Sequence, residues 1–193
     1  TIGDGVGVGT ITNDDPLPSV SVGDSTVVEH NVGDTNANFT VSLDNPSGRP
    51  VTVNYATADG TAQAPGDYES TAGTVTFDPG QTTRTVTVHV HGDLLNEADE
   101  TYFLNLSNAT NALIADDQGI GTILDDDNVP SLSIDDVTVT EGDLGTVNAD
   151  FTVSLSAPSE QTISVGWSTQ DDTAQAPEDY TAALPQPPSA QAT

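Results

Sequence analysis

The chain has 193 residues and a formal net charge of −28, with 30 acidic residues against two basic ones, Arg49 and Arg84. Such a charge repels nucleic acids and anionic membrane surfaces and makes a cation the natural partner. The sequence has no cysteine, which excludes disulfides and thiolate metal sites, and it has no apolar run long enough to cross a membrane.

The sequence repeats itself with an offset of 112 residues. Four pairs of stretches show the repeat: GVGTI at 7 and GIGTI at 119, PSVSV at 18 and PSLSI at 130, FTVSL at 39 and 151, and TAQAP at 61 and 173. A period of this length is that of a whole domain. The repeat therefore predicts the C-terminal strand of a preceding module in 1–15, a complete module in 16–127, the N-terminal part of a further module in 128–180, and a Pro/Ala/Gln-rich tail, expected to be disordered, in 181–193.

Apolar and polar residues alternate along the complete module, as they do in half-buried β-strands. Turn-forming Asn, Asp, Pro and Gly residues separate the alternating runs. The pattern predicts seven strands, of which the first is broken and the fourth begins irregularly: 19–28, 37–43, 50–57, 67–76, 82–91, 100–106 and 118–124. Seven antiparallel strands in about 110 residues favour an all-β, immunoglobulin-like sandwich, repeated as tandem modules.

The further module follows the repeat as far as Tyr180, where the tail replaces the counterpart of the predicted strand at 67–76. The counterparts of the last four strands are therefore missing from the pattern. We expect the remaining strands to expose unpaired edges and this part to be only marginally stable in isolation.

Acidic residues gather at one end of the predicted sandwich. Strands that run alternately up and down place the first, third and fifth connections, and the exit of the last strand, at the same end. Carboxylates held close together repel one another unless a cation neutralises them, and Ca²⁺ takes about six to eight oxygen ligands. The acidic residues at this end are Glu29, Asp67, Asp93, Glu97, Asp99, Glu100, Asp125, Asp126 and Asp127.

Each acidic segment alone is also what an ordinary solvated loop contains. The repeat favours a shared role, because Glu141 and Asp179 stand at the offset of Glu29 and Asp67. The histidines at 89 and 91 share a strand face but have no third soft ligand, so we interpret them as surface residues rather than a zinc or nickel site.

Several stretches of the complete module resemble the Calx-beta domain, a module of sodium–calcium exchanger regulatory regions and of many large extracellular proteins. They are TVVE at 26–29, DGTA at 59–62 with DY at 67–68, GTVTF at 73–77 with PG at 79–80, NEADE at 96–100, and GTILDDD at 121–127. The resemblance implies a seven-stranded antiparallel sandwich that binds Ca²⁺ in its distal loops. The ligands that it implies are Glu29, Asp67, Asp93, Glu97, Glu100, Asp125, Asp126 and Asp127.

The sequence departs from the family pattern at one position of the acidic end. The best Ca²⁺ binders of the family carry consecutive aspartates where this chain has Gly92-Asp93. The departure implies fewer bound ions or a weaker affinity.

These observations predict a calcium-binding, non-enzymatic module of an extracellular or cell-surface tandem array. We expect Ca²⁺ to connect the acidic loops to the linker at 125–129 and to stiffen the array in support of adhesion or surface scaffolding. The expected partners are calcium ions, neighbouring modules of the same chain and a protein or carbohydrate adhesion ligand, without nucleic acid or direct membrane insertion. Two alternatives stay open: a metal-independent spacer or adhesin stalk, and a carboxylate-dependent glycosidase.

Overall fold

A computed structural model of the chain describes residues 1 and 3–183, and all regular secondary structure in them is β-strand. Within these residues, no helix has the length and apolar character of a membrane span. The strands in chain order are β1 (Ser19–Val22), β2 (Ser25–Val28), β3 (Gly33–Leu43), β4 (Val51–Asp59), β5 (Ala72–Phe77), β6 (Thr83–Gly92), β7 (Glu100–Thr110), β8 (Leu113–Ile114), β9 (Gln118–Leu124), β10 (Leu132–Ile134) and β11 (Val153–Leu155).

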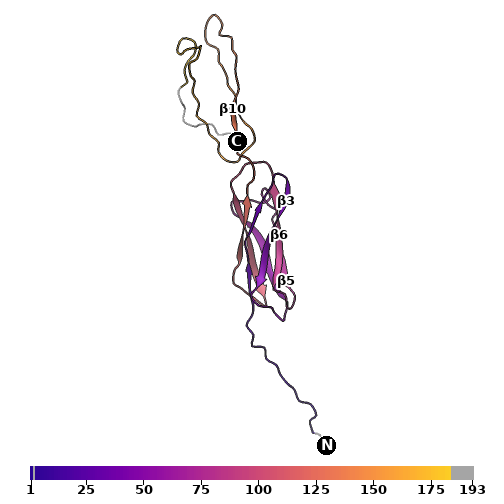
Figure 1. The fold of residues 1–193 in the computed structure, drawn as a ribbon. Helices are drawn as coiled ribbons and strands as arrows, with labels where there is room; N and C mark the ends of the chain where they lie inside the picture. The colour runs from indigo at the N-terminus through magenta and orange to yellow at the C-terminus, as the bar shows by residue number, and fades with distance from the viewer. Residues whose placement is uncertain (2, 184–193) are drawn as a thin grey trace.

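Two sheets form a sandwich, as the sequence predicted (Figure 1). One sheet has the strand order β6-β3-β1-β8 and the other has the order β2-β9-β7-β4-β5. The first predicted strand is broken, as expected, because the chain passes from one sheet to the other at Gly23-Asp24. Most neighbouring strands are antiparallel, but β1 pairs with β8 and β2 pairs with β9 in parallel.

The core lies between the two sheets and follows from the alternation in the sequence. In β3, Phe39 and Val41 are fully buried, whereas Thr40 between them is exposed. The Phe39 ring packs edge-on against Tyr102 at a centroid distance of 5.9 Å, and Tyr102 stacks on Tyr68 at 4.4 Å. Gly121 lies against the Tyr102 ring, where a Cβ atom would be 2.4 Å from the nearest ring carbon. A residue without a side chain is therefore needed at this point of β9.

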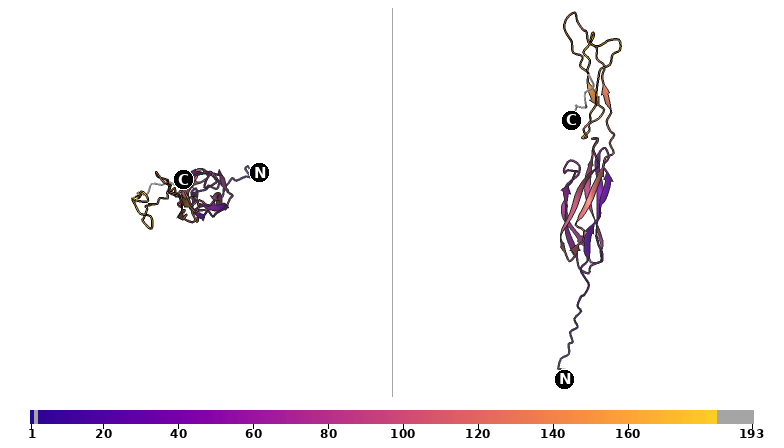
Figure 2. Two further views of the ribbon diagram at one scale, coloured as in Figure 1. Left: turned by 90° about the horizontal axis from the view of Figure 1, so that it is seen from above. Right: turned by 90° about the vertical axis from the view of Figure 1, so that its left-hand side faces the viewer.

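The parts outside the sandwich lie at its two ends (Figures 1 and 2). The described residues of 1–15 form no strand and lead away from one end, while 128–183 lie beyond the other end. Within 128–183, β10 and β11 form a separate antiparallel pair and no other strand is present. Phe151 and Trp167 are both more than half exposed. Residues 184–193 of the predicted tail lie outside the described residues.

The further module has no complete sheets, but it keeps some of the local hydrogen bonds of the complete module. The Tyr68 hydroxyl donates to Asp59 Oδ1 at 2.6 Å, and the Tyr180 hydroxyl donates to Asp171 Oδ1 at 2.6 Å. The backbone N–H of Gln63 donates to Asp67 Oδ2, and Gln175 makes the same bond with Asp179. The loop that carries Asp67 therefore has the same internal hydrogen bonds as its counterpart in the further module.

Replacing Phe39 by alanine is expected to destabilise the protein by about 3–5 kcal/mol, because it leaves a cavity beside Tyr102. Urea unfolding, followed by far-UV circular dichroism, measures this loss. Thr40→Ala in the same strand is the control and should change the free energy of unfolding by less than about 0.5 kcal/mol. Equal effects of the two changes would show that Phe39 does not belong to the core.

Candidate metal centre

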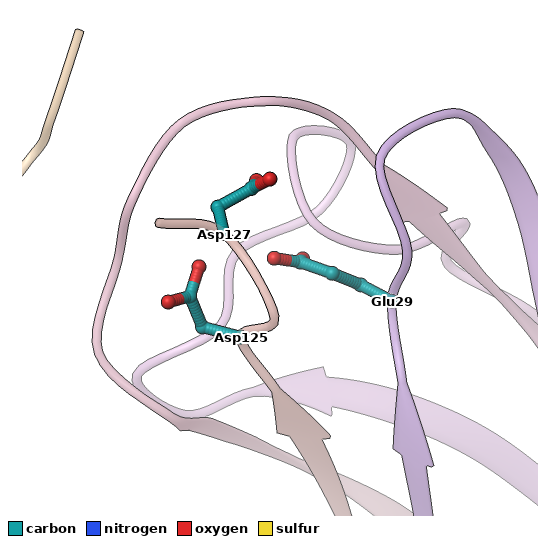
Figure 3. Close-up of side chains that lie close together, drawn as sticks. All are labelled: Glu29, Asp125 and Asp127. Carbon is teal, nitrogen blue, oxygen red and sulfur yellow. The ribbon is translucent and has the colours of Figure 1, made fainter. Parts of the chain in front are cut away.

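The parallel pairing of β2 and β9 brings one group of carboxylates together. The register pairs Val28 with Leu124, and the Glu29 N–H donates to the Leu124 carbonyl at 3.3 Å. Because parallel strands end at the same edge of a sheet, the residues that follow them enter the same space. Glu29, Asp125 and Asp127 each place a carboxylate oxygen within 4.8 Å of the others (Figure 3).

Glu29 is the most unusual carboxylate of this group, because its residue is only 3% exposed. Its Oε1 atom is buried without a hydrogen-bond partner, and so is Asp127 Oδ2. Burial first, and then the charges of Asp93 and Asp125, raise the pKa of Glu29 to about 7. A buried carboxylate oxygen with no donor is costly, so the arrangement has a place for a cation.

A second group of carboxylates lies at the same end of the sandwich. Asp67 follows β4, Glu97 lies between β6 and β7, and Glu100 begins β7; their oxygens also lie within 4.8 Å of one another. Burial raises the pKa of Glu97 to about 8, with added effects of neighbouring carboxylates. Burial, followed by a hydrogen bond with Asp67, raises the pKa of Glu100 to about 7. This group likewise concentrates negative charge that no basic side chain offsets.

Asn96 joins the β6–β7 loop to the start of the linker. It is 5% exposed, and its Nδ2 donates to Asp125 Oδ2 at 3.1 Å and to the Asp127 carbonyl at 3.3 Å. The Glu97 N–H donates to Asp125 Oδ1 at 3.1 Å. Sequence reasoning missed Asn96, since a neutral residue in an acidic loop attracts no attention. Its position directly before Glu97, inside the NEADE stretch, was the available signal.

The other acidic residues of this end have different surroundings. Asp93 belongs to neither group, although its charge raises the pKa of Glu29 and Glu97. Asp126 turns toward His30, whose backbone N–H donates to Oδ1 at 3.1 Å and whose Nδ1 lies 3.3 Å from Oδ2. Asp99 accepts the Asp125 N–H at 3.2 Å. Six of the eight ligands implied by the resemblance are thus divided between two groups, and Asp93 and Asp126 flank them.

Close packing of the backbone explains why position 92 is a glycine. A Cβ atom there would lie 2.0 Å from the His30 carbonyl oxygen and 2.6 Å from that of Glu29. The turn after β2, in which His30 has a φ of 69°, therefore packs directly on the end of β6. An aspartate at position 92 would displace this turn, and with it Glu29.

A family model described as the Calx-beta domain matches residues 13–127 and 124–185. The chain belongs to the Calx-beta family. Sodium/calcium exchanger 1 of Bos taurus is 44% identical over 70 residues, which are 36% of this chain and 7% of the exchanger. Sodium/calcium exchanger 3 of Homo sapiens is 46% identical over 56 residues, which are 29% of this chain and 6% of the exchanger. The matches thus span less than a tenth of these relatives.

Solved structures show the same Calx-beta sandwich. The apo-form Calx CBD1 domain has a TM-score of 0.50 and 28% identity, covering 58% of this chain and 100% of that domain. The calcium binding domain CBD12 of CALX1.1 has a TM-score of 0.50 and 29% identity, covering 56% of this chain and 44% of CBD12. Calx-beta domains bind Ca²⁺, and the buried Glu29 oxygen beside Asp125 and Asp127 fits such a hard cation.

The prediction of an extracellular or cell-surface location is wrong. The relatives are sodium/calcium exchangers, and the calcium-binding domains of those exchangers lie on the cytosolic side of the membrane. The features that suggested an extracellular array do not distinguish compartments. A cysteine-free, acidic chain needs no oxidising environment, and a calcium site can be built in either location.

Without metal, the stability of the protein is expected to fall as the pH rises from about 4.5 to 8. The pKa values of Glu29, Glu97 and Glu100 are raised from 4.5 to about 7–8, so the folded state binds more protons than the unfolded state in this window. The free energy of unfolding then decreases with pH. Thermal unfolding in EDTA should give a lower Tm at about pH 8 than at about pH 5.5, and Ca²⁺ should reduce the difference. A Tm in EDTA that rises over this range would contradict the raised pKa values.

Proposed function

We propose that the chain is a calcium-binding β-sandwich module of a tandem array, in which Ca²⁺ stiffens the junction with the following module. The observation that carries the proposal is the buried, unpartnered oxygen of Glu29, which faces Asp125 and Asp127 (Figure 3). Leaving such a group charged in the interior is unfavourable unless an opposite charge stands beside it.

The basic side chains of the chain are engaged elsewhere. Arg84 pairs with Asp78 at 3.3 Å and donates from Nε to the Thr76 carbonyl at 2.7 Å. Arg49 lies in the turn between β3 and β4, at the opposite end of the sandwich. Among the histidines, His30 contacts Asp126 and not Glu29. Neutralisation of the two carboxylate groups therefore calls for a cation from solution, and a cluster made only of oxygen ligands suits Ca²⁺.

The proposed ligands divide between two sites. One ion takes Glu29, Asp125 and Asp127, and a second takes Asp67, Glu97 and Glu100. Asp93 and Asp126 serve as further ligands, for which Asp126 leaves its contact with His30. The glycine at 92 keeps the number of carboxylates below that of the family's strongest binders, which supports a modest affinity.

The same ligands connect calcium to the linker. We take 16–127 as the complete module and 128–180 as part of the next, so that Asp125 and Asp127 belong both to the first site and to the start of the linker. A bound ion fixes these residues against Glu29 and thereby fixes the direction in which the chain leaves the sandwich. At a Ca²⁺ concentration ten times the Kd, binding adds about 1.4 kcal/mol to the free energy of unfolding, which is a rise in Tm of about 5 °C.

No catalytic activity is assigned to the chain. Adhesion and surface scaffolding depended on an extracellular location and are not part of its proposed role. The metal-independent spacer makes the opposite prediction for calcium, because its carboxylates serve only to keep the surface soluble. Removal of Ca²⁺ by EDTA should change the hydrodynamic radius and lower the Tm if the module stiffens its junction, and should change neither if it is a plain spacer.

Asp127→Asn is expected to weaken Ca²⁺ binding about tenfold or more, because it removes a charged ligand beside Glu29. Isothermal titration of the whole chain with CaCl₂ measures the change. Asp117→Asn is the matched control, since Asp117 is an exposed aspartate before β9, at the opposite end of that strand. It should leave the affinity unchanged. Equal affinities of the two variants and the wild type would contradict the proposed site.

A further inference from the structure

Asn96 contacts the linker and the further module at the same time. The Ser159 hydroxyl donates to the Asn96 backbone carbonyl at 3.0 Å and to its Oδ1 at 3.3 Å. The Glu160 N–H donates to the same backbone carbonyl at 3.2 Å. On the other side, Asn96 Nδ2 donates to Asp125 and to the Asp127 carbonyl. A residue with only 5% exposure therefore lies between the start of the linker and the turn after β11.

The partners of Asn96 determine how its amide is oriented. An ionised carboxylate and a backbone carbonyl only accept hydrogen bonds, so the amide nitrogen faces Asp125 and Asp127. A hydroxyl can donate, so the amide oxygen faces Ser159. An aspartate at position 96 would bring a second negative charge against Asp125. Asparagine thus offers a donor to the linker and an acceptor to the further module in one uncharged group.

The first site, made of Glu29, Asp125 and Asp127, depends on the loop that carries Asn96. Two carboxylate oxygens of this site are buried without a hydrogen-bond partner. Asp125 Oδ2 accepts from Asn96, and Asp125 Oδ1 accepts the Glu97 N–H at 3.1 Å. Each of these oxygens has a further lone pair, so Asp125 can still bind an ion while the loop holds its carboxylate in one direction. The position of the loop therefore sets how Asp125 lies in the site.

The turn after β11 reaches this site only through the β6–β7 loop. Besides the bonds to Asn96, the Gln161 side chain donates from Nε2 to the Glu97 carbonyl at 2.6 Å. Within the described residues, no hydrogen bond joins 159–161 directly to 125–127. Asn96 is the residue whose side chain has a partner on each side.

We propose that Asn96 is a positioning residue that couples the first calcium site to the docking of residues 159–161, although it is not itself a ligand. The inference rests on the proposed calcium-binding function. An ion that holds Asp125 in place also holds the Asn96 amide where its oxygen accepts from Ser159. If the ion favours docking of the turn, docking raises the affinity for the ion by the same factor.

Ser159→Ala in the whole chain tests the coupling from the side remote from the ion, with Ser154→Ala as the matched control. The Ser159 side chain donates to Asn96 and to none of the proposed ligands, whereas Ser154 is an exposed serine of β11. Isothermal titration with CaCl₂ should show about threefold weaker binding for Ser159→Ala, in the step that Asp127→Asn also weakens. Ser154→Ala should bind as the wild type does.

Asn96→Ala tests the same coupling at its centre. It should weaken that binding step about tenfold, because it removes a hydrogen bond to a charged acceptor. Adding Ser159→Ala to Asn96→Ala should cost less affinity than Ser159→Ala costs alone, since both changes break one connection. Backbone NMR of the wild type should show Ca²⁺-dependent shifts of the amides of 159–161, and these shifts should be lost or reduced in Asn96→Ala.

The outcomes separate this inference from the function on which it rests. If the wild type binds no Ca²⁺, the proposed function fails and the inference with it. If the wild type binds Ca²⁺ and Ser159→Ala binds it equally well, the inference is overturned and the calcium-binding function stands. A merely structural role of Asn96 would lower the Tm of Asn96→Ala in EDTA but would not make the Ca²⁺ affinity depend on Ser159. The Ser159→Ala titration therefore decides even if Asn96→Ala does not fold.

Discussion

The parallel pairing of β2 with β9 is the constraint on which the acidic end of the sandwich depends. It carries the chain from Val28 and from Leu124 out of the same edge of one sheet, so that Glu29 and Asp125 emerge side by side. The backbone pairing does not depend on the charges, and it places these two acidic residues at neighbouring positions. Burial of Glu29 then removes the water that would otherwise screen it.

In the metal-free protein, packing of the hydrophobic core stabilises the fold and repulsion among the carboxylates destabilises it. In the core, the ring of Tyr102 contacts both Phe39 and Tyr68. Tyr68 directly follows Asp67 in the chain, so the core reaches the acidic end of the sandwich. Packing of this kind holds the loops in place despite the repulsion among their side chains. A cation removes the repulsion without changing the packing. In the proposed function, the sandwich therefore stays folded in both states while the loops and the linker respond to the metal.

The alternation of residues was sufficient to predict the sandwich, and the parity of the connections was sufficient to predict which end is acidic. Strand β3 begins at Gly33 rather than 37 because its pairing with β6 continues to Gly92, beyond the apolar alternation. The division of the acids into two groups, the contact of Asp126 with His30, and the buried Asn96 depend on loop conformation, which has no periodic signal. The contact of Glu160 with Asn96 could not be found from the sequence, because it forms only through the packing of one module on the next.

The central claim is that the buried charge of Glu29 destabilises the metal-free protein and binds the metal. Thermal unfolding of the wild type and of Glu29→Gln, each in EDTA and in Ca²⁺ at about pH 8, tests it most directly, because at this pH the wild-type side chain is largely charged. The account predicts that Glu29→Gln has a higher Tm than the wild type in EDTA and gains less from Ca²⁺. A lower Tm of Glu29→Gln in EDTA, together with an undiminished gain from Ca²⁺, would contradict it.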